Sequence, residues 1–177
     1  MHGNTTKQSF VLIGMPCSGK TTIGALLAEE LGLEFVDTDR RIEQRVGDTL
    51  QNVLEKRGYM ALRNIEEQTL LKEAIKDKVI ATGGSAVYSH AGMNHLKSDA
   101  TVIFLDLPQQ QLENRMSNFS TRGIARKPGQ SFTSLFAERR ELYLRYADIQ
   151  IDCLGLTITQ LLDKLVLLAC PPQRSKS

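Results

Sequence analysis

The chain has 177 residues, 41% of them hydrophobic, and a formal net charge of +2 at pH 7. This length and composition predict a single domain over residues 1–177 with its own hydrophobic core. The nearly balanced charge and the lack of a dense basic run argue against a nucleic-acid-binding protein. The lack of an apolar run of about 18 residues argues against a membrane protein.

Short apolar runs alternate with longer amphipathic runs along the chain. This pattern predicts an α/β fold in which helices cover both faces of a parallel sheet, giving three α/β/α layers. The helix expected at 48–58 begins with Asp48 as its cap, in a D-x-x-Q pattern, and ends on Gly58. In chain order, strands are expected at 9–14, 34–37, 78–82, 101–106 and 148–152, and helices at 21–32, 40–47, 48–58, 59–77, 109–116, 131–147 and 157–169.

Three further features set the expected environment of the chain. Polar segments at 1–8 and 171–177 are expected to be frayed ends, and the first of them lacks the apolar core of a signal peptide. The cysteines are few, odd in number and without metal-ligand spacing, which is typical of a reducing cytoplasm. We therefore expect a cytoplasmic protein, with a monomer as the default state.

One long polar segment, SNFSTRGIARKPGQ at 117–130, interrupts the alternation of strands and helices. It is rich in Arg and Lys and contains Gly123, Pro128 and Gly129. Loops of this length are usually functional or disordered. The segment is therefore predicted to be a mobile lid over a charged ligand.

The segment GMPCSGKTT, from Gly14 to Thr22, contains a complete G-x-x-x-x-G-K-[ST] motif between a predicted strand and a predicted helix. Such a loop surrounds nucleotide phosphates with backbone N–H groups at the positive end of a helix. Lys20 is expected to reach the β- and γ-phosphates, and the Thr21 hydroxyl to ligate Mg²⁺. The weaker alternative is an ordinary strand–turn–helix. The expected nucleotide contacts are Gly14, Pro16, Cys17, Ser18, Gly19, Lys20, Thr21 and Thr22.

Two carboxylates, Asp37 and Asp39, stand at the end of the second predicted strand. Ligands of an open α/β sheet collect at the carboxyl ends of the strands, so both should lie near the phosphate-binding loop. Their spacing suits one carboxylate for hydrated Mg²⁺ and the other for a substrate hydroxyl. Alternatively, Asp39 caps a helix that begins at Arg40, and spacing does not decide between the two.

Five motifs, in order and spacing, resemble the shikimate kinase family. They are the Gly14–Thr21 loop, DTD at 37–39, LRNIE at 62–66, ATGGSAV at 81–87 and ERRELYLRYAD at 138–148. The resemblance implies a P-loop fold like that of nucleoside monophosphate kinases, with a five-stranded parallel sheet. It also implies that the γ-phosphoryl group of ATP, with Mg²⁺ as cofactor, is transferred to the 3-hydroxyl of shikimate.

The resemblance assigns roles to residues outside the phosphate-binding loop. Asp39 would hold the shikimate hydroxyls and assist removal of the 3-OH proton, and Asp37 would reach Mg²⁺ through water. Arg63 and Arg139 would bind the substrate carboxylate, with Glu66 orienting Arg63. The remaining implied residues are Gly83 and Gly84, whose backbone approaches the substrate ring, Arg115 against adenine, and Arg122, which acts with Lys20 and Asp39 in catalysis.

The arginines Arg63, Arg139 and Arg122 also have an ordinary structural interpretation. The spacing of Arg63 allows an ion pair with Glu66 or Glu67 along a helix. Arg139 lies in the charged run ERRE, where it is compatible with a solvent-exposed charge. The lid cations Arg122, Arg126 and Lys127 are equally compatible with exposed loop residues.

The sequence departs from the family pattern at three places. Ser85 replaces the third glycine of a triplet, Gly123 follows the lid arginine, and DCLGLT after the last strand lacks a basic residue beside adenine. A hydroxyl at Ser85 offers a hydrogen bond to a different ligand group. The alternatives are therefore a related kinase for another small hydroxy acid or polyol, and a nucleotide-binding regulatory module.

Overall fold

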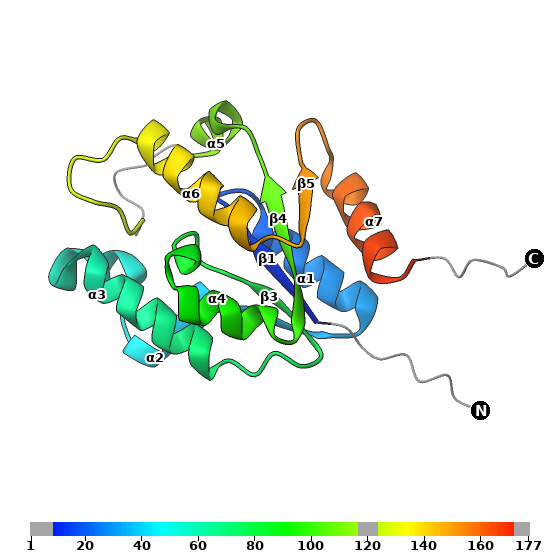
Figure 1. Ribbon diagram of the computed structural model, residues 1–177, viewed down its shortest axis with the longest axis horizontal. Coiled ribbons are helices and arrows are strands. Elements are labelled where there is room, and N and C mark those ends of the chain that lie inside the picture. The colour runs from blue at the N-terminus through cyan, green and yellow to red at the C-terminus, as the bar shows by residue number, and fades with distance from the viewer. Residues whose placement is uncertain (1–8, 117–123, 172–177) are drawn as a thin grey trace, which may run out of the picture.

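The computed structural model describes residues 9–116 and 124–171 (Figure 1). Its five parallel strands form one sheet in the order β2-β3-β1-β4-β5. This arrangement confirms the predicted fold class. The central strands are nearly continuous in buried Val, Ile, Leu and Phe because both faces of the sheet are covered. The strands are β1 (Ser9–Ile13), β2 (Glu34–Asp37), β3 (Lys78–Ala81), β4 (Ala100–Asp106) and β5 (Ile149–Asp152).

Helices cover both faces of this sheet (Figure 1). The first and last helices pack on each other, whereas the third and fourth form a second packed pair. No helix in the described ranges is both long enough and apolar enough to cross a bilayer. The helices are α1 (Lys20–Leu31), α2 (Thr38–Val46), α3 (Leu50–Lys72), α4 (His90–Lys97), α5 (Gln109–Arg115), α6 (Phe132–Tyr146) and α7 (Ile158–Ala169), with a 3₁₀ helix, η1 (Ala86–Tyr88).

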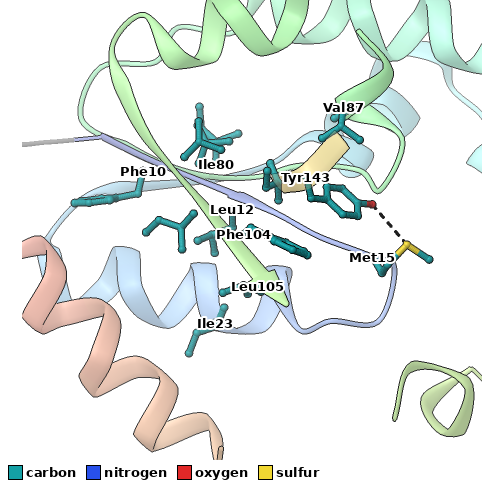
Figure 2. Close-up of a cluster of buried hydrophobic side chains, with 14 of the residues drawn as sticks. Phe10, Leu12, Met15, Ile23, Ile80, Val87, Phe104, Leu105 and Tyr143 are labelled. Carbon is teal, nitrogen blue, oxygen red and sulfur yellow. Dashed lines mark hydrogen bonds between the residues drawn. The ribbon is translucent and has the colours of Figure 1, made fainter. Parts of the chain in front are cut away.

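The main core lies on both sides of β1 and β4, as Figure 2 shows. Ile23 of α1 packs below the sheet, whereas Val87 of η1 and Tyr143 of α6 lie above it. The Tyr143 ring stacks on Phe104 of β4, with 5.1 Å between the ring centroids. The core therefore anchors α1, η1 and α6, the three elements next to the site described below.

Helix boundaries differ from the predicted ones where capping decides them. The predicted cap Asp48 is wrong, because α3 begins at Leu50 and the Thr49 side chain accepts a hydrogen bond from the Asn52 N–H. Gly58 does break the helical geometry, with φ 79°. However, the following helix ends at Lys72 rather than at 77, since Glu73 has an extended backbone with ψ 127°.

The predicted lid is only partly within the described residues. Arg122 and Gly123 lie outside them, so the lid role of that arginine stays a prediction. Ile124 and Ala125, which follow, are buried. The chain then turns at Gly129, with φ 74°, before α6 begins.

Candidate active site

The loop between β1 and α1 has the backbone geometry that its glycines permit. Gly14 has φ 147°, and a Cβ there would lie 2.9 Å from the carbonyl oxygen of Leu105. Gly19 caps α1 with φ 95°, and Cys17 also has a positive φ, 65°. Because N–H groups in the first turn of a helix lack intrahelical partners, this turn offers donors to an anion.

Lys20 is folded back onto its own loop. Its Nζ donates hydrogen bonds to the carbonyl oxygens of Gly14 at 2.9 Å and Met15 at 2.7 Å, and to Ser18 Oγ at 3.3 Å. Burial lowers the pKa of Lys20 to about 8, partly offset by the negative charge of Asp39. The loop carbonyls offer the Lys20 ammonium only partial negative charges. A bound phosphate would offer it a full negative charge.

Asp37 connects the phosphate-binding loop to the start of α2. Its Oδ2 accepts a hydrogen bond from Thr21 Oγ1 at 2.7 Å, and its Oδ1 accepts from the N–H groups of Asp39 and Arg40. Asp37 is therefore the cap of α2, and the alternative in which Asp39 caps a helix at Arg40 is wrong.

The donor set at Thr21 and Asp37 fits Mg²⁺. This ion is usually held by one or two protein oxygens together with substrate phosphates and water, and a hydroxyl beside a carboxylate supplies such oxygens. Within 9–116 and 124–171, no group of three or more His, Cys, Asp or Glu side chains could hold a metal by itself.

Asp39 lies inside the cavity with an unsatisfied carboxylate oxygen. Its Oδ1 is buried and has no hydrogen-bond partner within the described part of the chain. Burial raises the pKa of Asp39 to about 6, and the charge of Asp37 adds to that shift. A buried, unpaired acceptor of this kind is suited to a hydroxyl donor from a ligand.

Sheet register brings the glycine turn after β3 to the same level as these carboxylates. Asp37 pairs with Ala81, so Gly83 follows directly beside α2, where its N–H donates to Thr38 Oγ1 at 3.0 Å. A Cβ on Gly83 would overlap Asp39 Oδ1 and lie 2.9 Å from Glu66 Oε1. A side chain at this position would therefore displace the two carboxylates from where they lie.

Gly84 is just as tightly enclosed. A Cβ on it would lie 2.8 Å from Arg139 Nη1 and 2.8 Å from Pro16 Cδ. Its carbonyl oxygen accepts a hydrogen bond from Tyr143 Oη at 2.6 Å. Tyr143 Oη also contacts Met15 Sδ at 3.8 Å, the dashed line in Figure 2, and so joins the glycine turn to the phosphate-binding loop.

Ser85 interacts with the protein itself. Its hydroxyl lies 2.5 Å from both carboxylate oxygens of Glu66. Burial raises the pKa of Glu66 to about 7, an effect that the Ser85 hydrogen bond partly counters. The donor that distinguishes this chain from the glycine triplet is thus directed at Glu66.

The two predicted carboxylate-binding arginines lie in different surroundings. Arg139 is 1% exposed and donates from Nη2 to the Ala125 carbonyl at 2.6 Å, so the interpretation as a solvated charge is wrong. The Nε atoms of Arg63 and Arg139, and Nη2 of Arg63, are buried without hydrogen-bond partners in the described ranges. Among described residues, Arg63 forms no ion pair with Glu66 or Glu67, so the interpretation as a helical salt bridge is wrong. Glu66 and Arg63 still interact at longer range, because the positive charge of Arg63 counters part of the rise in the pKa of Glu66.

A cavity of about 460 Å³ gathers most of the predicted site. Arg63 does not line it, and Gly83 contributes by making room for Asp39. Sequence reasoning missed the apolar walls, the partly buried Leu50 and the buried Ile124 and Ala125, since apolar side chains carry no signal of a site. The cavity is lined by Pro16, Cys17, Gly19, Lys20, Thr21, Thr22, Asp37, Asp39, Leu50, Glu66, Thr82, Gly84, Ser85, Ile124, Ala125 and Arg139.

A second cavity, of about 230 Å³, lies behind the phosphate-binding loop. Its lining includes Ser18, Gly19 and Thr22, which belong to the phosphate-binding loop and the start of α1. Arg115 is the basic residue in this lining. Arg115 Nη1 donates to the Cys17 carbonyl at 3.3 Å. Most of the other lining residues are apolar, among them Leu107, Cys153, Leu156, Ile158 and Leu161.

The phosphate-binding loop and the adjoining cavity, with its carboxylates and buried arginine, define a P-loop phosphotransferase with an alcohol as acceptor. The family model for shikimate kinase matches residues 16–168. A curated shikimate kinase of Aquifex aeolicus is 34% identical over 141 residues, which cover 79% of this chain and 83% of that protein. The chain therefore belongs to the shikimate kinase family.

Solved structures agree with this assignment. The shikimate kinase from Acinetobacter baumannii in complex with shikimate superposes with a TM-score of 0.81 and 29% identity, over 92% of this chain and 93% of that one. The crystal structure of the Aquifex aeolicus enzyme gives a TM-score of 0.75 and 30% identity, over 89% and 94% of the two chains.

Proposed function

We propose that this protein transfers the γ-phosphoryl group of ATP to the 3-hydroxyl of shikimate. The observation that carries the proposal is the convergence of Lys20, Asp39 and Arg139 on one cavity of about 460 Å³. A small ring with hydroxyls and one carboxylate matches a cavity that offers both a carboxylate and a guanidinium. The shared name of the relatives supports shikimate as that acceptor.

In this proposal the protein acts by positioning and by charge. Asp39, whose Oδ1 has no other hydrogen-bond partner in the described ranges, accepts a hydrogen bond from the acceptor hydroxyl. It takes the hydroxyl proton as the new P–O bond forms and the bond from the γ-phosphorus to the bridging oxygen breaks, with ADP as the leaving group. Lys20 exchanges the carbonyl oxygens of its loop for the β- and γ-phosphates, where its charge stabilises the transferring group. Arg122, outside the described residues, is proposed as the second cation on that group.

Nucleotide and metal are assigned to the loop side of the cavity. We assign Mg²⁺ to the Thr21 hydroxyl and, through water, to Asp37, which are 2.7 Å apart. When bound, Mg²⁺ would neutralise charge on the β- and γ-phosphates. Arg115 is assigned to the adenine. The remaining proposed nucleotide contacts are Pro16, Cys17, Ser18, Gly19 and Thr22, which line the two cavities, and Gly14 at the start of the loop.

The acceptor side is assigned to Asp39, Arg63, Gly83, Gly84 and Arg139. The burial of Arg139 supports this role, because a buried guanidinium with an unpartnered Nε has much to gain from a carboxylate. The engagement of Ser85 with Glu66 argues against the alternative in which its hydroxyl selects another acceptor.

The test is acceptor-dependent release of ADP from Mg-ATP with shikimate, quinate, gluconate, homoserine or no acceptor. We expect ADP release with shikimate only. Asp39→Asn keeps the shape of the side chain but removes the base, so it should abolish transfer while calorimetry shows ATP binding unchanged. ATP binding without shikimate-dependent ADP release would contradict the proposal and favour a nucleotide-binding regulatory module.

We further propose that the protein is one domain and works as a cytoplasmic monomer, with small molecules rather than nucleic acid as its partners. Light scattering at micromolar concentration should give the mass of a single chain, 19.7 kDa.

A further inference from the structure

Arg63 lies against two aromatic rings rather than against a carboxylate. Its guanidinium carbon lies 3.5 Å from the ring centroid of Tyr88 and 5.2 Å from that of Tyr59. The face of an aromatic ring is negative, so it attracts a cation, most strongly where water is excluded. Nε and Nη2 of Arg63 are buried and have no hydrogen-bond partner in the described ranges, so ring contacts account for where this guanidinium lies.

The carboxylate that the sequence predicts as the partner of Arg63 is engaged elsewhere. Both oxygens of Glu66 face the Ser85 hydroxyl at 2.5 Å. A glycine at position 85 would offer no such donor. The segment after β3 thus provides a close contact to each side chain, the Ser85 hydroxyl to Glu66 and the Tyr88 ring to Arg63.

Tyr88 is also close to the second arginine. The guanidinium carbon of Arg139 lies 5.6 Å from the centroid of the Tyr88 ring, so this one ring neighbours both cations. Two guanidinium groups so close to a common point repel each other unless negative charge lies between or beside them. The Tyr88 ring has no net charge, but its electron-rich face offsets part of this repulsion in the free protein.

The Tyr88 ring is itself held in place. Its hydroxyl donates a hydrogen bond to Glu138 Oε1 at 2.6 Å. Glu138 Oε2 accepts further hydrogen bonds from Lys127 Nζ at 3.2 Å and Gln130 Nε2 at 2.9 Å. These bonds fix the ring from its outer edge and leave its face for Arg63.

We propose that Tyr88 is a positioning residue that holds Arg63 beside Arg139 for the acceptor carboxylate, in the role expected of Glu66. The proposal rests on the proposed function, since it takes that carboxylate as the ligand of the two arginines. It makes Tyr88 a determinant of specificity for carboxylated acceptors without contact between Tyr88 and the reacting atoms.

The kinetic test compares Tyr88→Leu, which removes the ring, with Tyr88→Phe, which keeps the ring and removes the hydrogen bond to Glu138. Tyr88→Leu should raise the KM for shikimate by between about twofold and about thirtyfold, the range of a cation–ring contact. The KM for ATP and kcat should change by less than about twofold, since Tyr88 lines neither cavity. Tyr88→Phe should lie close to the unaltered protein.

An acceptor without the carboxylate separates positioning from general damage. With the primary alcohol that corresponds to shikimate, Tyr88→Leu and the unaltered protein should have the same KM, because the arginines then have no charge to bind. An equal rise in KM for both acceptors would overturn the proposal. If Tyr88→Leu does not fold, as judged by its thermal unfolding, Tyr88→Met replaces the ring with a flexible apolar chain of similar length.

A second readout does not depend on turnover. The Nε–H proton of Arg63 gives an NMR signal that can be assigned by its loss in Arg63→Lys. Its exchange with water should be slow in the unaltered protein and in Tyr88→Phe, and at least about tenfold faster in Tyr88→Leu. Unchanged exchange in Tyr88→Leu would overturn the role of Tyr88, whereas absence of shikimate turnover in the unaltered protein would overturn the proposed function instead.

Discussion

The protonation of Asp39 should set the acid limb of the activity profile. Burial raises the pKa of this carboxyl to about 6, and its role as a proton acceptor requires the ionised form. The ionised fraction is about nine-tenths at pH 7 and about one-eleventh at pH 5, so activity should fall about tenfold between them. Lys20, with a pKa of about 8, should produce the alkaline limb, since its cation is lost as pH rises through that value.

The assay is the initial rate of ADP release from pH 4.5 to 9.5, with ATP and shikimate both well below their KM values. Under these conditions the profile reports the groups of the free protein. Glu43→Gln is the matched variant, because the charge of Glu43 contributes to the raised pKa of Asp39. Its acid limb should move to lower pH, whereas the titration of the nucleotide is the same for both proteins. Activity that is flat between pH 7 and pH 5 would refute the need for ionised Asp39.

Three further outcomes follow from the same geometry. Arg63→Lys should raise the KM for shikimate by about tenfold with kcat retained, because an ammonium cannot bind a carboxylate through two parallel bonds; an unchanged KM would remove Arg63 from the site. Gly83→Ala should lower kcat by about tenfold to a hundredfold, since its Cβ would overlap Asp39 Oδ1, and an unchanged kcat would show that Asp39 keeps its position without this glycine. Glu66→Gln should make stability less dependent on pH. Burial raises the pKa of Glu66 from 4.5 to about 7, so the native state binds the extra proton and its stability falls as pH rises through that window. The fall is at most about 3 kcal/mol, and urea unfolding at pH 4.5 and pH 8 should find most of it missing in the variant.

Local sequence patterns determined the fold and the phosphate-binding loop. Strands such as β4 are recognisable because an apolar run long enough to cross a sheet, bounded by turn residues, has few other stable arrangements. The loop motif is recognisable because only glycine tolerates the backbone of Gly14 beside Leu105. The resemblance to a family added roles for Asp39, Arg63 and Arg139, but it did not predict their contacts or distances.

Side-chain partners, in contrast, were decided by the tertiary structure. The spacing of Arg63 and Glu66 fits a helical ion pair, yet Ser85 and Tyr88, some 20 residues further along the chain, engage them separately. In the same way Asp37, rather than Asp39, caps α2, which leaves Asp39 Oδ1 without a partner among the described residues. A sequence fixes which groups are four residues apart on a helix. The partner of a buried carboxylate or guanidinium depends instead on distances between side chains of different helices, strands and loops. Hydrogen bonds and ring contacts act only within a few ångströms.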